Sequence, residues 1–127
     1  MKLKWDYVGV VSADLARSID FYRLVGIPLP DAESDHVEVE LESGMRFALD
    51  SVELMKSIGH WEAPVGHRMG MAFNAGTPAG VNEAFQAIVD AGFESKTEPF
   101  DAFWGQRYAQ ILDPDGNPVD LYAALES

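Results

Sequence analysis

One order of predicted elements occurs twice along the 127 residues, and this repeat limits the possible folds more than any other feature. Residues 5–11 have strand character and lead into an amphipathic helix over 12–26 that Gly26 closes. Residues 68–74 again have strand character, and the helix over 77–92 is closed by Gly92, 66 residues after Gly26. Each half therefore predicts an open sheet with a helix on one face, whose other face forms a cup.

Alternating side chains predict the remaining strands. In the first half, residues 36–41 and 45–50 flank a turn at 42–44, and the tail over 51–60 is helical or irregular. In the second half, short strands are predicted near 93–97, 107–112 and 119–123. A turn with proline and glycine, residues 113–117, joins the last two strands. Ser12 or Asp14 is expected to cap the first helix, and Thr77 the second.

Composition excludes several classes of function. Nine Lys and Arg against 21 Asp and Glu give a formal charge of -12, which opposes binding to nucleic acid or anionic membranes. The same field attracts cationic small molecules or a basic protein, although acidity also serves solubility alone. The absence of cysteine excludes disulfides and thiolate sites. Because Asp6 and Gly9 interrupt any apolar signal core, a cytoplasmic protein is expected.

Two long segments are informative together: VGVVSADLARSIDFYRLVGI, residues 8–27, and FWGQRYAQILDPDGNPVDLYA, residues 103–123, joined by AFQAIVDAGF in the second helix. They resemble the vicinal oxygen chelate superfamily, which includes glyoxalase I, extradiol dioxygenases and bleomycin-resistance proteins. The resemblance implies an α+β fold of two βαβββ modules, roughly residues 4–58 and 66–125, within a single domain of residues 1–127. In this fold a curled mixed sheet surrounds a central cup, the helices lie outside, and a homodimer is common.

Enzymes of this family usually hold a divalent metal with His, Gln or Glu on the first strand of each module and a Glu on the last strand of the second module. The corresponding residues here are Tyr7, Gly70 and Asp120, and one carboxylate does not make such a site. His36 alternates onto a solvent-facing side of its strand, and His60 and His67 flank a loop. We therefore expect no metal and no other cofactor, with a relocated divalent metal site using His67 and Asp120 as the alternative.

Strand parity and the family's cavity together nominate a ligand site. Asp120 and Tyr122 are expected to face the cup, while Val119 and Leu121 face the helices. The full predicted ligand-binding set is Tyr7, Phe100, Phe103, Trp104, Arg107, Tyr108, Asp120 and Tyr122. The aromatic rings precede a strand and are expected in a loop. The rings are also explained as a plug of the open end or as a dimer contact. Asp120 is also explained as an acceptor of hydrogen bonds from Arg107 or a tyrosine.

Three classes of function remain. Bleomycin-resistance proteins also carry a Trp-Gly pair before a DP-x-GN turn and lack the metal, so the resemblance implies binding or sequestration of a planar or cationic metabolite or antibiotic. The alternative is a glyoxalase-like lyase or isomerase, or a dioxygenase, acting on a small carbonyl or aromatic substrate. It would use a relocated metal, or Asp120 as catalytic base with Tyr7 or Tyr122 as acid. The third is a dimeric interaction module whose acidic face meets a basic protein.

Overall fold

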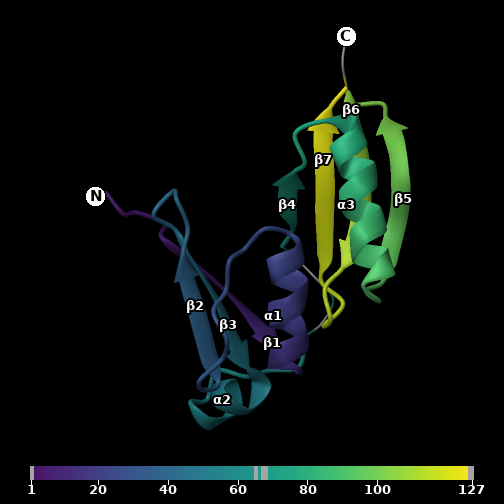
Figure 1. The fold of residues 1–127 in the computed structure, drawn as a ribbon. Coiled ribbons are helices and arrows are strands. Elements are labelled where there is room, and N and C mark those ends of the chain that lie inside the picture. Colours follow the sequence, from purple (N-terminus) through teal and green to yellow (C-terminus); the bar gives the residue numbers. More distant parts are fainter. Residues whose placement is uncertain (1, 65, 67–68, 126–127) are drawn as a thin grey trace. The chain divides into compact units, whose positions relative to one another are not determined.

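The computed structural model describes residues 2–64, 66 and 69–125. The chain divides into two compact units, Met1–Ala63 and Pro64–Ser127, which are described in turn (Figure 1). The predicted α+β class is confirmed, because each unit combines a mixed sheet with helices. The single domain with modules 4–58 and 66–125 stays a prediction.

The first unit contains a three-stranded sheet and two helices. Its elements are β1 (Tyr7–Ser12), α1 (Leu15–Leu24), β2 (His36–Glu40), β3 (Arg46–Ser51) and α2 (Val52–Ser57). The strand order is β1-β3-β2, with β1 parallel to the central β3 and β2 antiparallel to it. The helical tail predicted after β3 is α2, so this unit has no fourth strand among its described residues.

Capping side chains explain where the helices of the first unit begin. The Asp14 carboxylate accepts from the backbone N–H of Arg17, so Asp14 rather than Ser12 caps α1. The Ser51 hydroxyl accepts from the N–H of Leu54 and starts α2 immediately at the end of β3. The core of the unit forms where α1 meets β3. There the centroid of the fully buried Tyr22 ring lies 4.9 Å from the centroid of the Phe47 ring.

The second unit follows the predicted βαβββ order. Its elements are β4 (Met71–Asn74), α3 (Pro78–Asp90), β5 (Ser95–Ala102), β6 (Gln106–Leu112) and β7 (Pro118–Ala124). The strand order is β4-β7-β6-β5, with β4 parallel to β7 and the other pairs antiparallel. Thr77 caps α3 and Pro78 occupies its first turn, as predicted.

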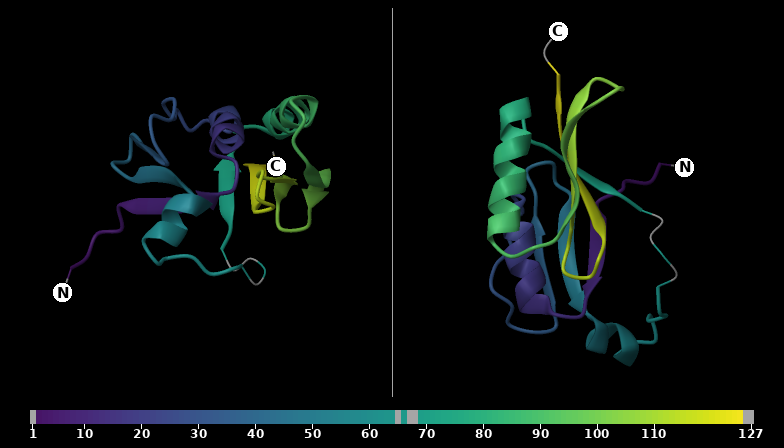
Figure 2. Two further views of the ribbon diagram at one scale, coloured as in Figure 1. Left: turned by 90° about the horizontal axis from the view of Figure 1, so that it is seen from below. Right: turned by 90° about the vertical axis from the view of Figure 1, so that its right-hand side faces the viewer.

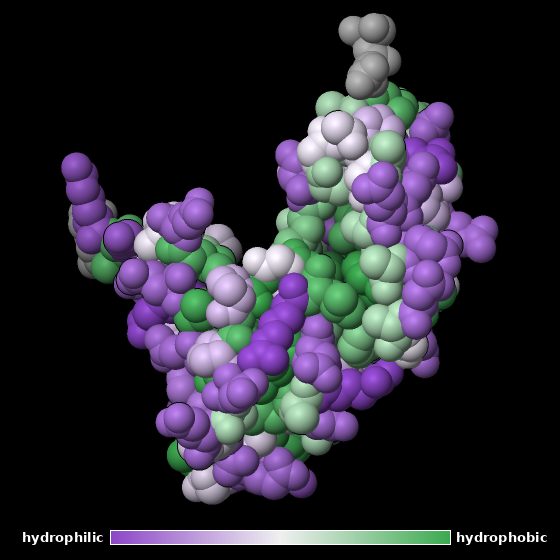
Figure 3. All heavy atoms as spheres, in the orientation of Figure 1, coloured by the Kyte–Doolittle hydropathy of each residue, from purple (hydrophilic) through white to green (hydrophobic). Residues whose placement is uncertain are grey.

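Helix α3 packs along one face of the four-stranded sheet (Figure 2). Its buried side chains are Val81, Phe85 and Ile88. Buried and partly exposed residues alternate along β7, so that Val119, Leu121 and Ala123 are buried while Asp120 and Tyr122 are partly exposed. The opposite side of α3 is polar, and polar residues are plentiful on the surface seen in Figure 3. Each sheet therefore has a face that the helix of its own unit covers and an opposite face, called here its open face.

The segment before β6 differs from the prediction. Phe100 lies within β5, which is eight residues long and pairs with β6 through two register shifts. Only residues 103–105 form the connection, a tight turn in which Gly105 has φ of +91° and its N–H donates to the carbonyl of Ala102. The predicted loop is therefore the tip of a β-hairpin, and Phe103 and Trp104 are its turn residues.

Candidate functional site

An aromatic cluster lies at the β5–β6 hairpin of the second unit. It consists of Phe100, Trp104 and Tyr108, whose ring centroids lie 5.2 to 6.2 Å apart with the rings edge to face. Trp104 Nε1 donates to Gln106 Oε1 at 2.8 Å, which fixes the orientation of the indole. Because 48% of Trp104 and 38% of Phe100 are exposed, the cluster presents aromatic surface to solvent.

Asp120 lies on the open face of the same sheet and accepts a hydrogen bond. Gln110, its cross-strand partner, donates from Nε2 to Asp120 Oδ1 at 2.9 Å. Thr97 supports the pair by donating to Gln110 Oε1 at 3.0 Å. Tyr108 is two residues from Gln110 on β6 and so faces the same side of the sheet, where the Asp120 carboxylate helps to raise the pKa of its hydroxyl.

The pKa of Tyr108 is raised to about 12. Burial of the phenol is the largest cause, followed by the hydrogen bond to Asp120 and the negative charge of that carboxylate. A hydrogen bond with Gln110 acts in the opposite direction. The phenol therefore stays protonated at neutral pH and can serve as a hydrogen-bond donor.

The predicted ligand-binding residues do not all share this place. Tyr122 lies opposite Tyr108 in the β6–β7 register and so faces the same side as Asp120. Arg107 points to the other side, where its guanidinium donates to Asn82 of α3 at 3.0 Å and to Asp101 at 3.1 Å. Phe103 is 97% exposed and touches the cluster only through Trp104, at 5.1 Å between centroids.

Tyr7 belongs to the first unit and lies on the open face of its sheet. The Arg46 guanidinium lies 5.0 Å from the centre of its ring, a cation–π distance. The ring also lies along β1 over Gly9, where an added Cβ would come within 3.2 Å of a ring carbon. The pKa of Tyr7 is raised, first by burial and then by the charges of Asp50 and Glu38.

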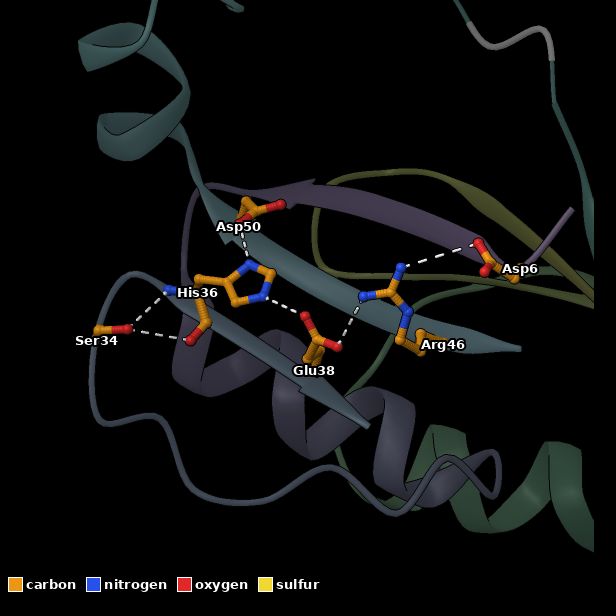
Figure 4. A network of polar contacts seen from close by, with 6 residues as sticks. All are labelled: Asp6, Ser34, His36, Glu38, Arg46 and Asp50. Carbon is orange, nitrogen blue, oxygen red and sulfur yellow. Dashed lines mark hydrogen bonds and ion pairs between the residues drawn. The ribbon is translucent and has the colours of Figure 1, made fainter. Parts of the chain in front are cut away.

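A charged network that is not among the features predicted from the sequence covers this open face (Figure 4). His36 Nδ1 is 2.5 Å from Asp50 Oδ1, and His36 Nε2 is 2.9 Å from Glu38 Oε1. Arg46 extends the network through two ion pairs. Its NH1 lies 3.5 Å from Glu38 Oε2, and its NH2 lies 3.9 Å from Asp6 Oδ1. The prediction that His36 simply faces solvent is therefore incomplete, because both of its ring nitrogens are engaged.

Two carboxylates also shift the pKa of His36. It is raised, first by the hydrogen bond with Asp50 and then by that with Glu38, against a smaller opposing effect of burial. The pKa of Glu38 is lowered, chiefly by its hydrogen bond with His36. A register count from the 42–44 turn, which pairs His36 with Asp50, was the one sequence signal for this contact.

The side chains at the family's metal positions do not fit a metal ion. Ala72 of β4 pairs with Asp120 of β7, so β4 supplies no ligand atom beside the carboxylate. His60 is exposed beyond α2, while His67 lies outside the described residues. Among residues 2–64, 66 and 69–125, no three His, Cys, Asp or Glu side chains converge as a metal site would require. Asp120 is the only metal-ligating type among Tyr7, Gly70 and Asp120.

Comparison with known proteins supports the architecture. The family model for the Glyoxalase/Bleomycin resistance protein/Dioxygenase superfamily matches residues 4–121. A solved protein of that description from Nocardioides superposes with a TM-score of 0.77 and 23% identity, covering 100% of this chain and 87% of its own. A family enzyme from Burkholderia phytofirmans gives a TM-score of 0.82 at 16% identity, and the match covers 97% of this chain and 100% of that enzyme.

A third similar structure is that of a protein of unknown function from Agrobacterium tumefaciens. The two sequences are 26% identical and the TM-score is 0.72, and the match covers 98% of this chain and 97% of that protein. No curated protein matches the chain. No helix within the described residues is long and apolar enough to cross a membrane.

Proposed function

We propose that this chain, which belongs to the glyoxalase/bleomycin resistance protein/dioxygenase superfamily, binds and sequesters a planar or cationic organic molecule. The observation that carries the proposal is the aromatic cluster of Phe100, Trp104 and Tyr108, with the Asp120 carboxylate on the same face and near enough to raise the pKa of Tyr108. Tyr122 lies on the same open face and extends this proposed ligand surface.

The chemistry of these groups suits an aromatic cation. Exposed rings of Trp and Phe offer flat stacking surface, and each cation–π contact contributes on the order of 1 kcal/mol. Asp120 provides a counter-charge that acts on Tyr108 of the cluster, whose pKa it helps to raise. The formal charge of -12 raises the local concentration of cations and speeds their association. The site therefore favours positively charged aromatic ligands over anionic ones.

A binding titration with matched probes tests this function. The probes are 9-aminoacridine, a planar cation at neutral pH, acridine, its largely neutral counterpart, and bleomycin. Isothermal titration calorimetry measures the affinity of every variant. Tryptophan fluorescence, with Trp5→Phe and Trp61→Phe in the background, reports contact with Trp104 wherever that residue is retained. We expect the cation to bind more tightly than acridine, and Trp104→Ala to weaken it by about tenfold or more.

Two controls decide the outcome. Phe103→Ala removes an exposed ring that meets the cluster only through Trp104, so it is expected to change affinity little. Recovery of chemically unchanged probe after prolonged incubation distinguishes sequestration from turnover. Equal affinity for the cation and the neutral ring, together with an unchanged Trp104→Ala variant, would contradict the proposed site.

A glyoxalase-like lyase or isomerase is the second candidate, and the Asp120 environment favours it. A carboxylate held by Gln110, with the Tyr108 and Tyr122 phenols on the same face, offers a base beside proton donors. Such a site would enolise a small carbonyl compound. Under this alternative the wild type converts a 2-oxoaldehyde or hydroxyketone and Asp120→Asn abolishes that turnover. The sequestration function predicts no product from the wild type or from the variant.

Assembly and location also belong to this proposal. We expect a homodimer, which light scattering coupled to gel filtration measures directly, and a cytoplasmic location. A basic protein partner would instead give association that weakens with salt. No metal ion is part of the proposed ligand surface.

A further inference from the structure

A feature separate from the aromatic cluster is the Glu38 carboxylate, which two cations of the first unit hold between them (Figure 4). Glu38 Oε1 is 2.9 Å from His36 Nε2, and Glu38 Oε2 is 3.5 Å from Arg46 NH1. Each oxygen thus faces a different positive group. This is the arrangement in which a protein receives the carboxylate of a ligand.

His36 must carry a positive charge for both of its contacts to be hydrogen bonds. Ionised carboxylates only accept, and Asp50 and Glu38 lie at opposite nitrogens of the ring, so both nitrogens must donate. The imidazolium is held in place by Asp50, whose side chain is only 12% exposed on the central strand β3. The ring orientation therefore does not depend on Glu38.

Glu38 is the replaceable member of the network. Its side chain is 36% exposed, and its contact with Arg46 is an ion pair without hydrogen-bond geometry. Arg46 is itself 43% exposed, and its other contact, with Asp6, is a longer ion pair of 3.9 Å. Moving Glu38 into water leaves the buried Asp50 charge still neutralised by His36, so displacement uncovers no buried charge.

We propose that the open face of the first unit binds a small organic carboxylate between His36 and Arg46, in the place that Glu38 occupies. Glu38 is then a built-in competitor that keeps the two cations paired when no ligand is present. The Tyr7 ring, 5.0 Å from the Arg46 guanidinium, adds aromatic surface next to this position. This site is distinct in residues and in ligand charge from the proposed site around Trp104.

Protonation of His36 controls this site. The charged and titratable groups that face it or its partners are Asp50 and Arg46 of β3, Glu38 of β2, Tyr7 of β1 and Asp6 before β1. Loss of the imidazolium proton removes one of the two cations, and the remaining carboxylates then repel an anion. Binding is therefore expected below the ordinary imidazole pKa of about 6.5 and is lost as pH rises through the raised pKa of His36.

The experiment titrates sodium acetate and sodium benzoate, at constant ionic strength, into the wild type and two variants. Glu38→Ala removes the competitor, while Glu42→Ala removes an exposed turn carboxylate and makes the same change in net charge. The imidazole 15N and Hε1 resonances of His36, assigned with a His36→Gln variant, report binding at the ring. Glu38→Gln serves if Glu38→Ala does not fold.

We expect saturable acetate binding to the wild type, tightened about tenfold or more in Glu38→Ala and unchanged in Glu42→Ala. Arg46→Gln in the Glu38→Ala background is expected to abolish the gain. Binding to Glu38→Ala alone would overturn the proposal, because the wild-type pair would then be a permanent internal contact. An equal gain in Glu42→Ala, or no saturable shift at His36 in either protein, would overturn it as well.

Discussion

Gln110 donates a hydrogen bond from Nε2 to Asp120 Oδ1 across the β6–β7 strand pair, at 2.9 Å, and this bond fixes the one carboxylate among Tyr7, Gly70 and Asp120. Tyr108 faces the same side of the sheet, and the Asp120 carboxylate helps burial to raise the pKa of its hydroxyl to about 12. The aromatic cluster and the carboxylate therefore act on each other at this face.

Replacing Asp120 is expected to lower the pKa of Tyr108. Asp120→Asn removes the negative charge and the strong acceptor, so the pKa should fall from about 12 toward the ordinary 10 while remaining above it, because burial persists. Absorbance at 295 nm against pH measures phenolate formation, and Tyr108→Phe identifies the signal among the four tyrosines. An unchanged titration in Asp120→Asn would show that burial alone sets this pKa.

His36 is expected to make stability depend on pH in one direction. Its pKa is raised in the folded protein, so its contribution is fully present below the unfolded value of about 6.5 and is lost as pH rises through the folded value. Urea unfolding at a series of pH values should show His36→Gln less stable than the wild type by about 1 kcal/mol in acid, because the site is partly open to solvent.

The same comparison contains its own control. At a pH above the folded pKa of His36 the two proteins should approach equal stability, since the wild-type ring then carries no charge. His60→Gln, at an exposed position after α2, should follow the wild type throughout. A His36→Gln deficit that is constant with pH would mean that packing, rather than charge, supplies the stability.

Replacing Gly80 with alanine is not expected to give the gain in stability that is usual for a glycine inside a helix. Alanine favours helix by about 1 kcal/mol over glycine. At Gly80, however, an added Cβ would lie 2.4 Å from the backbone carbonyl oxygen of Ala75, which must then shift. Gly80→Ala should therefore lower the free energy of unfolding by about 1 to 3 kcal/mol. A stabilised variant in urea unfolding would refute this close approach at the start of α3.

Much of the fold could be predicted because its signals are local. The Thr77 cap, the following proline and the closing glycine mark α3, and alternation along β7 separates Asp120 from Leu121. Strand β5 was missed at its far end because two register shifts and Pro99 interrupt its alternation. For this reason the sequence pattern predicts a loop at Phe100.

The contacts of the charged residues depended on pairing between strands. His36 was placed on the polar side of β2, yet its partner Asp50 is 14 residues away and is found only through the hairpin register. Arg107 was grouped with Tyr108, although neighbouring residues of a strand face opposite sides and Ala109 is buried beneath α3. Parity along β6 was sufficient to separate them.

Titration with divalent metals separates the proposed function from a metal-dependent alternative. Calorimetry of the chelator-treated protein with manganese, nickel, zinc and anaerobic ferrous iron should show no tight binding that depends on Asp120, because its β4 neighbour is Ala72. Asp120→Ala and His60→Gln provide the site and surface controls. Micromolar binding abolished by Asp120→Ala would favour a metal-dependent lyase, isomerase or dioxygenase, with ligands beyond those assigned here.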